Sequence, residues 1–194
     1  MRTLPVMLLL ALAALLCFPD SLVRAGTLLS VVSARRAPTI DGQLRTNEWA
    51  GFTAATGFET LEGGGLAETQ PVFYMTFDAD RFLVAVCVPR SSGSELRSNT
   101  TDRDGALYND DSLELFLQPD PDSTTYYQFA VNAGGTVLDA KGQDVGWDAE
   151  WDVRTRGTSA SWSAEFAIPW QAVGCAKAPG TLGFNVAWNC RSGT

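Results

Sequence analysis

The chain reads Asp110-Asp111-Ser112-Leu113-Glu114-Leu115-Phe116-Leu117-Gln118 near its middle, and this alternation of apolar and polar residues predicts a β-strand. Successive side chains of a strand point to opposite faces, so the three leucines share one face, while Glu114 and Phe116 share the other. Acidic residues are depleted in strands, so a carboxylate in the middle of this one requires a reason. Two interpretations are open: Glu114 faces water, or it faces a ligand.

Strand-like runs recur through the rest of the chain about every 8–12 residues, with turn residues between them. They cover residues 28–32, 52–58, 72–77, 82–88, 125–132, 136–138, 151–156, 161–168 and 182–190. Only short helical turns are expected, at 47–49 and 169–173. We therefore predict an all-β fold with little helix, a sandwich of two antiparallel sheets of jelly-roll or immunoglobulin-like type.

The same alternation separates a core face from an outer face in three of these runs. The apolar sets expected in the core are Tyr127, Phe129 and Val131; Trp162, Ala164, Phe166 and Ile168; and Phe184, Val186 and Trp188. Polar side chains on the opposite faces are either simply exposed or turned toward a ligand: Gln128, Asn132, Asn185 and Asn189. We expect the tryptophans at positions 49, 151, 162, 170 and 188 to be core residues rather than binding platforms.

The first residues have the signature of a secretion signal. Arg2 precedes an apolar run over 4–18, and Val23-Arg24-Ala25 ends in a small residue suited to cleavage. The run is short for a membrane span and no second apolar run follows it. We predict a cleaved signal peptide over 1–25, a secreted or periplasmic location without a membrane anchor, and a single domain over 26–194. Because the chain stops just after its last strand, we also expect a sandwich that lacks its closing strand.

The composition excludes several classes of function. The formal net charge is −8, and the basic residues are scattered rather than gathered in a stripe, which argues against nucleic acid and anionic membranes as partners. The chain has no histidine, so Ser-His-Asp, Cys-His and histidine-ligated metal chemistry are all excluded. Any catalysis would depend on carboxylates.

The cysteines do not form a disulfide framework. Removal of the predicted leader leaves an odd number, Cys87, Cys175 and Cys190. Cys87 lies in an apolar run and is expected in the core, and whether Cys175 and Cys190 pair stays open because the sequence does not fix their separation.

An ordered series of motifs resembles the family 9 carbohydrate-binding modules and spans nearly all of residues 38–190. The motifs are Ile40-Asp41-Gly42 with Trp49; Asp78-Ala79-Asp80; the central strand 111–117; Tyr127-Gln128-Phe129 with Asn132; Trp162-Ser163-Ala164-Glu165-Phe166-Ala167-Ile168-Pro169-Trp170; and Gly183-Phe184-Asn185. The resemblance implies a two-sheet sandwich, usually appended to secreted polysaccharide-degrading enzymes. Its sugar-binding members clamp a terminal sugar between two tryptophans, with polar strand side chains on its hydroxyls and calcium supporting the loops.

The resemblance implies a carbohydrate site made of Tyr108 and Glu114. Glu114 matches the family's strand glutamate, and Tyr108 stands where a stacking tryptophan is usual. Ala130 takes the position of an arginine and Ala187 that of an amide, while the second tryptophan would lie beyond Thr194. One ring face burying roughly 100 Å² at about 25 cal/mol per Å² contributes about 2.5 kcal/mol, or nearly two decades of affinity. We therefore predict weak or altered binding of an oligo- or polysaccharide.

Each of these two residues also has a plainer interpretation. Glu114 could be a solvent-facing strand residue, and Tyr108 could be a loop aromatic packed on the sandwich edge. The domain would then be a structural or protein-interaction sandwich that has lost sugar binding, and its oligomeric state stays open.

Calcium as a structural cofactor is implied by the resemblance alone. Aspartates gather in loops at positions 78, 80, 102, 104, 110, 111, 120 and 122, but no spacing among them matches a complete calcium loop, so the ligands stay unknown. A carboxylate glycosidase needs two carboxyl groups about 5 Å or about 6.5–9.5 Å apart. Glu165 lies on a different predicted strand from Glu114, so we predict a non-catalytic binding domain associated with polysaccharide breakdown.

Overall fold

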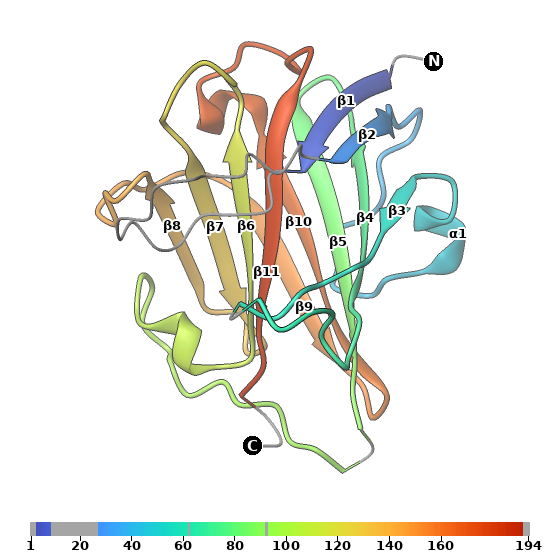
Figure 1. The fold of residues 1–194 in the computed structure, drawn as a ribbon, viewed down its shortest axis with the longest axis vertical. Coiled ribbons are helices and arrows are strands. Elements are labelled where there is room, and N and C mark those ends of the chain that lie inside the picture. Colours follow the sequence, from blue (N-terminus) through green and yellow to red (C-terminus); the bar gives the residue numbers. More distant parts are fainter. Residues whose placement is uncertain (1–2, 9–26, 62, 92, 192–194) are drawn as a thin grey trace.

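The alternating central stretch forms strand β6 (Ser112–Gln118) in the computed structural model, which describes residues 3–8, 27–61, 63–91 and 93–191. β6 lies inside a six-stranded sheet (Figure 1). The order of that sheet is β2 (Thr27–Val32), β1 (Thr3–Leu8), β11 (Leu182–Asn189), β6, β7 (Tyr127–Asn132) and β8 (Val137–Lys141). Its neighbouring strands are antiparallel except β1 and β11, which run parallel.

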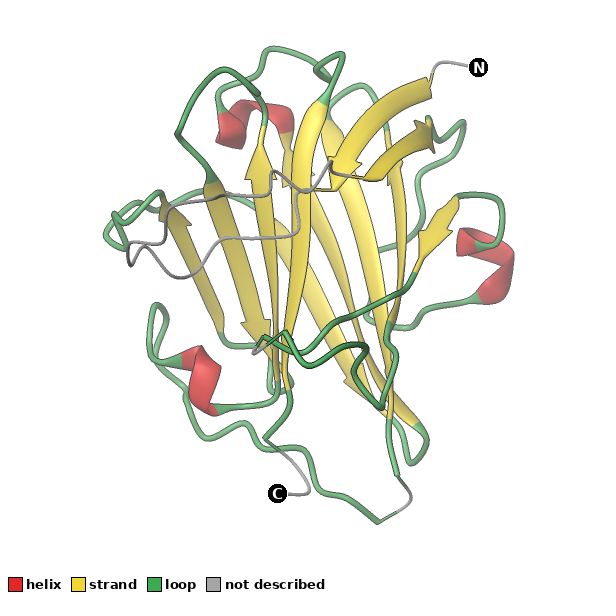
Figure 2. Cartoon of the chain, in the orientation of Figure 1, coloured by secondary structure: helices red, strands yellow, loops and turns green. Residues whose placement is uncertain are grey.

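A five-stranded antiparallel sheet packs behind it. Its order is β3 (Thr53–Ala55), β4 (Val72–Phe77), β5 (Arg81–Pro89), β10 (Ser161–Pro169) and β9 (Asp152–Gly157). In the part of the chain that the structure describes, helical structure is limited to three short turns, and Figure 2 shows the helices outside the sheets. They are α1 (Thr46–Trp49), η1 (Leu107–Asn109) and η2 (Trp170–Val173). The predicted all-β sandwich with little helix is therefore confirmed.

The core lies between the two sheets and is made of the predicted faces. The three leucines of β6 are fully buried there, beside Phe129 and Val131 of β7. From the other sheet, Phe166 of β10 packs against Trp151 with nearly parallel rings, 6.1 Å between centroids. Three of the five tryptophans expected in the core are almost completely buried, and Trp151 and Trp188 are partly buried against it.

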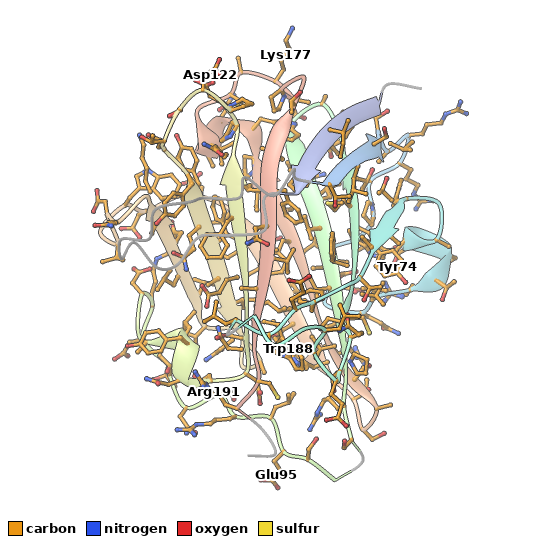
Figure 3. The ribbon with its side chains drawn as sticks, viewed as in Figure 1. Tyr74, Glu95, Asp122, Lys177, Trp188 and Arg191 are labelled. Carbon is orange, nitrogen blue, oxygen red and sulfur yellow. The ribbon has the colours of Figure 1, made fainter. Side chains whose placement is uncertain are left out.

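The outer faces of the two sheets differ. On the five-stranded sheet, residues 37–52 lie over Leu83, Ala85 and Ala167, and Trp49 of α1 is buried in this second cluster. Tyr74, labelled in Figure 3, belongs to the same layer, with its ring centroid 6.4 Å from that of Trp49. On the six-stranded sheet the outer side chains of β6, β7 and β11 are largely polar, so this face is the one that can present polar groups to a ligand.

The N-terminal prediction is only partly covered by the described residues. β1 (Thr3–Leu8) pairs with β2 and β11, whereas residues 1–2 and 9–26 lie outside the described part of the chain. The cleaved signal peptide over 1–25 and the location that follows from it stay predictions. No helix among the described residues is long and apolar enough to cross a membrane.

Two cysteine expectations are resolved by the fold. Cys175 has a free thiol and therefore does not pair with Cys190 in this structure. The expectation that Cys87 lies in the core is wrong, because Val86 and Val88 point inward and alternation turns Cys87 to the partly buried outer face of β5.

Candidate functional site

Glu114 lies on the outer face of the six-stranded sheet and is held by two amide side chains. Its Oε2 accepts a hydrogen bond of 2.7 Å from Gln128 Nε2 of β7, and its Oε1 accepts one of 2.6 Å from Asn189 Nδ2 of β11. The residues directly opposite Glu114 are Ala130 and Ala187, so both amides reach it diagonally from the next outward positions. We call Gln128, Glu114 and Asn189 the amide–carboxylate row.

The chemistry of a carboxylate fixes the orientation of this row. A carboxylate only accepts hydrogen bonds, so each amide must turn its NH₂ group toward Glu114 and its carbonyl oxygen away. The NH₂ of Asn189 also donates to Ser112 Oγ at 3.0 Å. The row is therefore a preorganised polar group, and the hydrogen-bonding capacity that these bonds leave over is mainly that of an acceptor.

Two aromatic rings lie beside the row on the same face. Phe116 is the next outward residue of β6 after Glu114, and the centroid of its ring is 6.1 Å from that of Tyr126. Tyr126 was not among the predicted site residues, although it stands two residues before Gln128 and the period of two places both on one face. Phe116 is thus covered in part by a second ring rather than by water alone.

Tyr108 lies in η1, just before β6, and its side chain is free to meet a ligand. The residue is 59% exposed, while its neighbour Leu107 is buried and fixes the turn. Its backbone oxygen accepts a 2.9 Å hydrogen bond from Arg191 Nε, two residues beyond Asn189. Figure 3 shows Arg191 at the lower end of β11, so Tyr108 belongs to the same end of the sheet as Asn189. The roles of Tyr108 and Glu114 in binding stay predictions.

The two aspartates at the entrance of β6 are buried and structural. Asp110 accepts hydrogen bonds from the backbone N–H groups of residues 99 and 100 and from Asn132 Nδ2, at 2.8–3.0 Å. Burial acts to raise the pKa of Asp110, but these hydrogen bonds outweigh it and hold the pKa below its ordinary value. Asp111 accepts from the backbone N–H groups of Arg97 and Arg191. Asn132, one of the side chains that could have faced a ligand, is fully buried in this network.

Glu165 lies on the opposite side of the molecule from Glu114. It is fully buried under residues 37–52 and accepts hydrogen bonds from Asp41 N, Gly42 N and Trp49 Nε1 at 2.8–2.9 Å. Two packed sheets are about 10 Å apart, and these carboxylates sit on the two outer faces, so their separation exceeds that of a glycosidase pair. Glu165 instead anchors the segment that covers the five-stranded sheet.

Comparison with known sequences identifies the family. The family described as "Carbohydrate family 9 binding domain-like" matches residues 40–194. The chain belongs to this family. The resemblance read from the ordered motifs is thereby confirmed, and a fold of the carbohydrate-binding-module type is assigned. No curated protein matches the chain by sequence.

Solved structures of family 9 modules share the sandwich. One is a carbohydrate binding module family 9 from Caldicellulosiruptor kristjanssonii in complex with cellotriose, at 19% identity and a TM-score of 0.61, covering 81% of this chain and 75% of that one. Another, a family 9 module from the same organism in complex with glucose, has 18% identity and a TM-score of 0.58, covering 81% and 76%. At this level of identity the likeness establishes the fold.

The loop carboxylates of this family 9 domain do not provide a donor set for calcium. Among the residues described, no three acidic side chains form a group that could hold a metal ion. The densest acidic cluster, Asp104, Asp139 and Asp148, converges on Arg103, whose guanidinium pairs with all three. A guanidinium thus occupies the centre where a cation would be coordinated. Calcium stays a prediction from the resemblance.

Proposed function

We propose that this family 9 domain is a secreted, non-catalytic module that binds an oligo- or polysaccharide and serves polysaccharide breakdown. The amide–carboxylate row is the observation that carries the proposal. A partly buried carboxylate held between two amides on the outer face of the sheet offers fixed acceptors for the hydroxyl groups of a sugar. Family membership and the complexes of related modules with cellotriose and glucose support a saccharide as the ligand class.

We expect the binding to be weak. Tyr108 supplies one exposed ring at the end of the sheet, and Ala130 and Ala187 add no polar atoms beside Glu114. The Phe116–Tyr126 pair offers a second apolar surface, but its rings are tilted by 54° to each other and do not form one flat platform. Dissociation constants near the millimolar range, equivalent to about 4 kcal/mol, fit such a site.

Calorimetric titration with cellotriose and glucose, with and without calcium, tests the proposal. Glu114→Ala is expected to abolish the signal, because the two amides lose their anchor together with the acceptor. Glu150→Ala is the matched control, since Glu150 is an exposed loop carboxylate outside the site. Absence of heat for every sugar refutes the proposal, and normal binding by Glu114→Ala places the site elsewhere.

A second candidate is a structural or protein-interaction sandwich. The observation that favours it is Ala130, which is only 2% exposed and offers a ligand no polar atom beside Glu114. Affinity capture from the natural secretome discriminates the two. Recovery of glycans without a protein partner supports the carbohydrate module, and recovery of one stoichiometric protein supports the alternative.

A further inference from the structure

We propose that the amide–carboxylate row selects a sugar that carries a positively charged amino group over the corresponding neutral sugar. The inference rests on the proposed carbohydrate function and specifies the class of sugar. Two observations carry the inference: the acceptor atoms of the row have hydrogen-bonding capacity left, and no ion pair among the described residues neutralises the negative charge of Glu114.

The unused capacity of the row is mostly that of an acceptor. Each carboxylate oxygen of Glu114 receives one hydrogen bond from a described residue and has lone pairs left. The carbonyl oxygens of Gln128 and Asn189 are turned away from Glu114 by the orientation that the carboxylate imposes. Both N–H bonds of Asn189 are engaged, with Glu114 and Ser112, so Gln128 alone keeps one amide N–H to offer a ligand. A complementary ligand must therefore bring donors.

Among the described residues, the negative charge of the row has no basic partner. None of the ion pairs among the described residues involves Glu114. The nearest positions across the ladder are Ala130 and Ala187, and Arg191 beyond the end of β11 donates instead to the carbonyl of Tyr108. Within the described part of the chain, the groups that compensate this partly buried carboxylate are the two amides.

A sugar ammonium satisfies both requirements at once. It brings three N–H donors and one positive charge, whereas a hydroxyl brings one donor and no charge. Hydrogen bonds between ionised partners are roughly twice as strong as neutral ones. We expect roughly a tenfold preference for the amino sugar, and rejection of the corresponding uronic acid because its carboxylate would meet that of Glu114.

The experiment compares three β-1,4-linked trimers of the same length by calorimetric titration of the full chain. They are the glucosamine trimer, the N-acetylglucosamine trimer and cellotriose, titrated at about pH 6, where a sugar amine is protonated. The wild type should bind the glucosamine trimer roughly tenfold more tightly than cellotriose, and N-acetylation should remove the advantage. The advantage should also shrink when the salt concentration rises.

Two isosteric variants test the charge of the row, and the readout is the ratio of the two affinities within each variant. Glu114→Gln removes the charge and one of the two acceptor oxygens, so it should weaken the binding of both trimers and reduce the preference for the glucosamine trimer to about twofold or less. Glu150→Gln removes the same charge from an exposed loop and should leave the preference intact. A urea unfolding curve for each variant verifies that the domain remains folded.

The outcomes separate the inference from the proposed function. Equal affinity of the wild type for the glucosamine trimer and cellotriose overturns the inference but leaves the carbohydrate function standing. A preference that survives Glu114→Gln, or that disappears equally in Glu150→Gln, overturns it as a property of the row. Failure to bind any of the three trimers refutes the proposed function itself.

Discussion

Glu165 offers the sharpest test of how the fold is held together. Its carboxylate joins β10 to a segment more than 110 residues away through three hydrogen bonds, from Asp41 N, Gly42 N and Trp49 Nε1. Gly42 has φ +80°, and a Cβ there would lie 2.8 Å from the backbone of Thr155, so the turn that presents these donors has no room to rearrange. Truncation by Glu165→Ala removes all three acceptors at once.

The expected cost of Glu165→Ala is about 3 kcal/mol of unfolding free energy. Leaving a buried donor unsatisfied costs about 1–3 kcal/mol, and the N–H of Gly42 and that of Trp49 both belong to buried hydrogen bonds. The gain from no longer burying a carboxylate offsets part of this cost. Burial raises the pKa of Glu165, and its hydrogen bonds act in the opposite direction without cancelling the effect.

The raised pKa of Glu165 fixes the sign of a pH dependence. The stabilising contribution of this group is complete below its unfolded pKa of 4.5 and is lost as the pH rises through the higher folded value. Glu165→Gln keeps the shape without the charge, so its cost relative to the wild type should be smaller than that of the alanine variant. That cost should also decrease as the pH rises through the folded pKa.

Urea unfolding followed by tryptophan fluorescence measures these differences, since Trp49 lies at the anchored segment. Glu150→Ala serves as the reference and should change the unfolding free energy by less than about 0.5 kcal/mol. Hydrogen exchange at residues 41–49 should accelerate in Glu165→Ala before the rest of the sandwich is affected. A cost for Glu165→Ala within about 1 kcal/mol of the reference would refute the anchoring role.

Three further changes test the loops around the candidate site. Asp110→Asn should lower the free energy of unfolding by about 1–3 kcal/mol near neutral pH, as measured by urea unfolding. Because hydrogen bonds hold the pKa of Asp110 down, the difference in unfolding free energy between variant and wild type should disappear as the pH falls below about 3.8. Arg103→Met should lower the melting temperature and the free energy of unfolding, because fully buried Asp139 loses its cation. Arg103 is itself 42% exposed, so solvent screening limits the expected loss of unfolding free energy to about 2 kcal/mol. Added calcium should not restore the melting temperature of Arg103→Met if the cluster has no donor set of its own. Tyr108→Ala should weaken sugar binding by up to nearly two decades, the value of one ring face, without changing the melting temperature, and an unchanged affinity would remove Tyr108 from the site.

The strands of the sandwich were predictable because local pattern determines them. The expected ranges of β4 and β6 coincide with the structure, and the leucine face of β6 lies in the core as alternation requires. β3 is shorter than the expected run over 52–58, because only Thr53–Ala55 pairs with β4. The length of β3 is set by its pairing with β4, which the local sequence pattern does not reveal.

The arrangement of the site was less predictable, because it depends on register between distant strands. Alternation placed Gln128 and Asn189 on outer faces, but it could not show that both reach Glu114. The pairing of β6 with β11 joins segments about 70 residues apart, and a slip of one residue would turn every side chain to the other face. The buried role of Glu165 was missed for a related reason, since a segment distant in sequence covers the outer face of its strand.

The two alanines beside Glu114 acquire a different meaning once the register is known. From the sequence they read as lost contacts, because Ala130 and Ala187 replace polar residues of the family. In the sheet they stand directly across from Glu114, and their small side chains leave the space through which the diagonal amides close on the carboxylate. A bulky residue at either position would lie between the carboxylate and one of its amides. The two alanines that the resemblance interprets as lost contacts therefore permit the amide–carboxylate row, and this geometry favours a changed choice of sugar over a loss of binding.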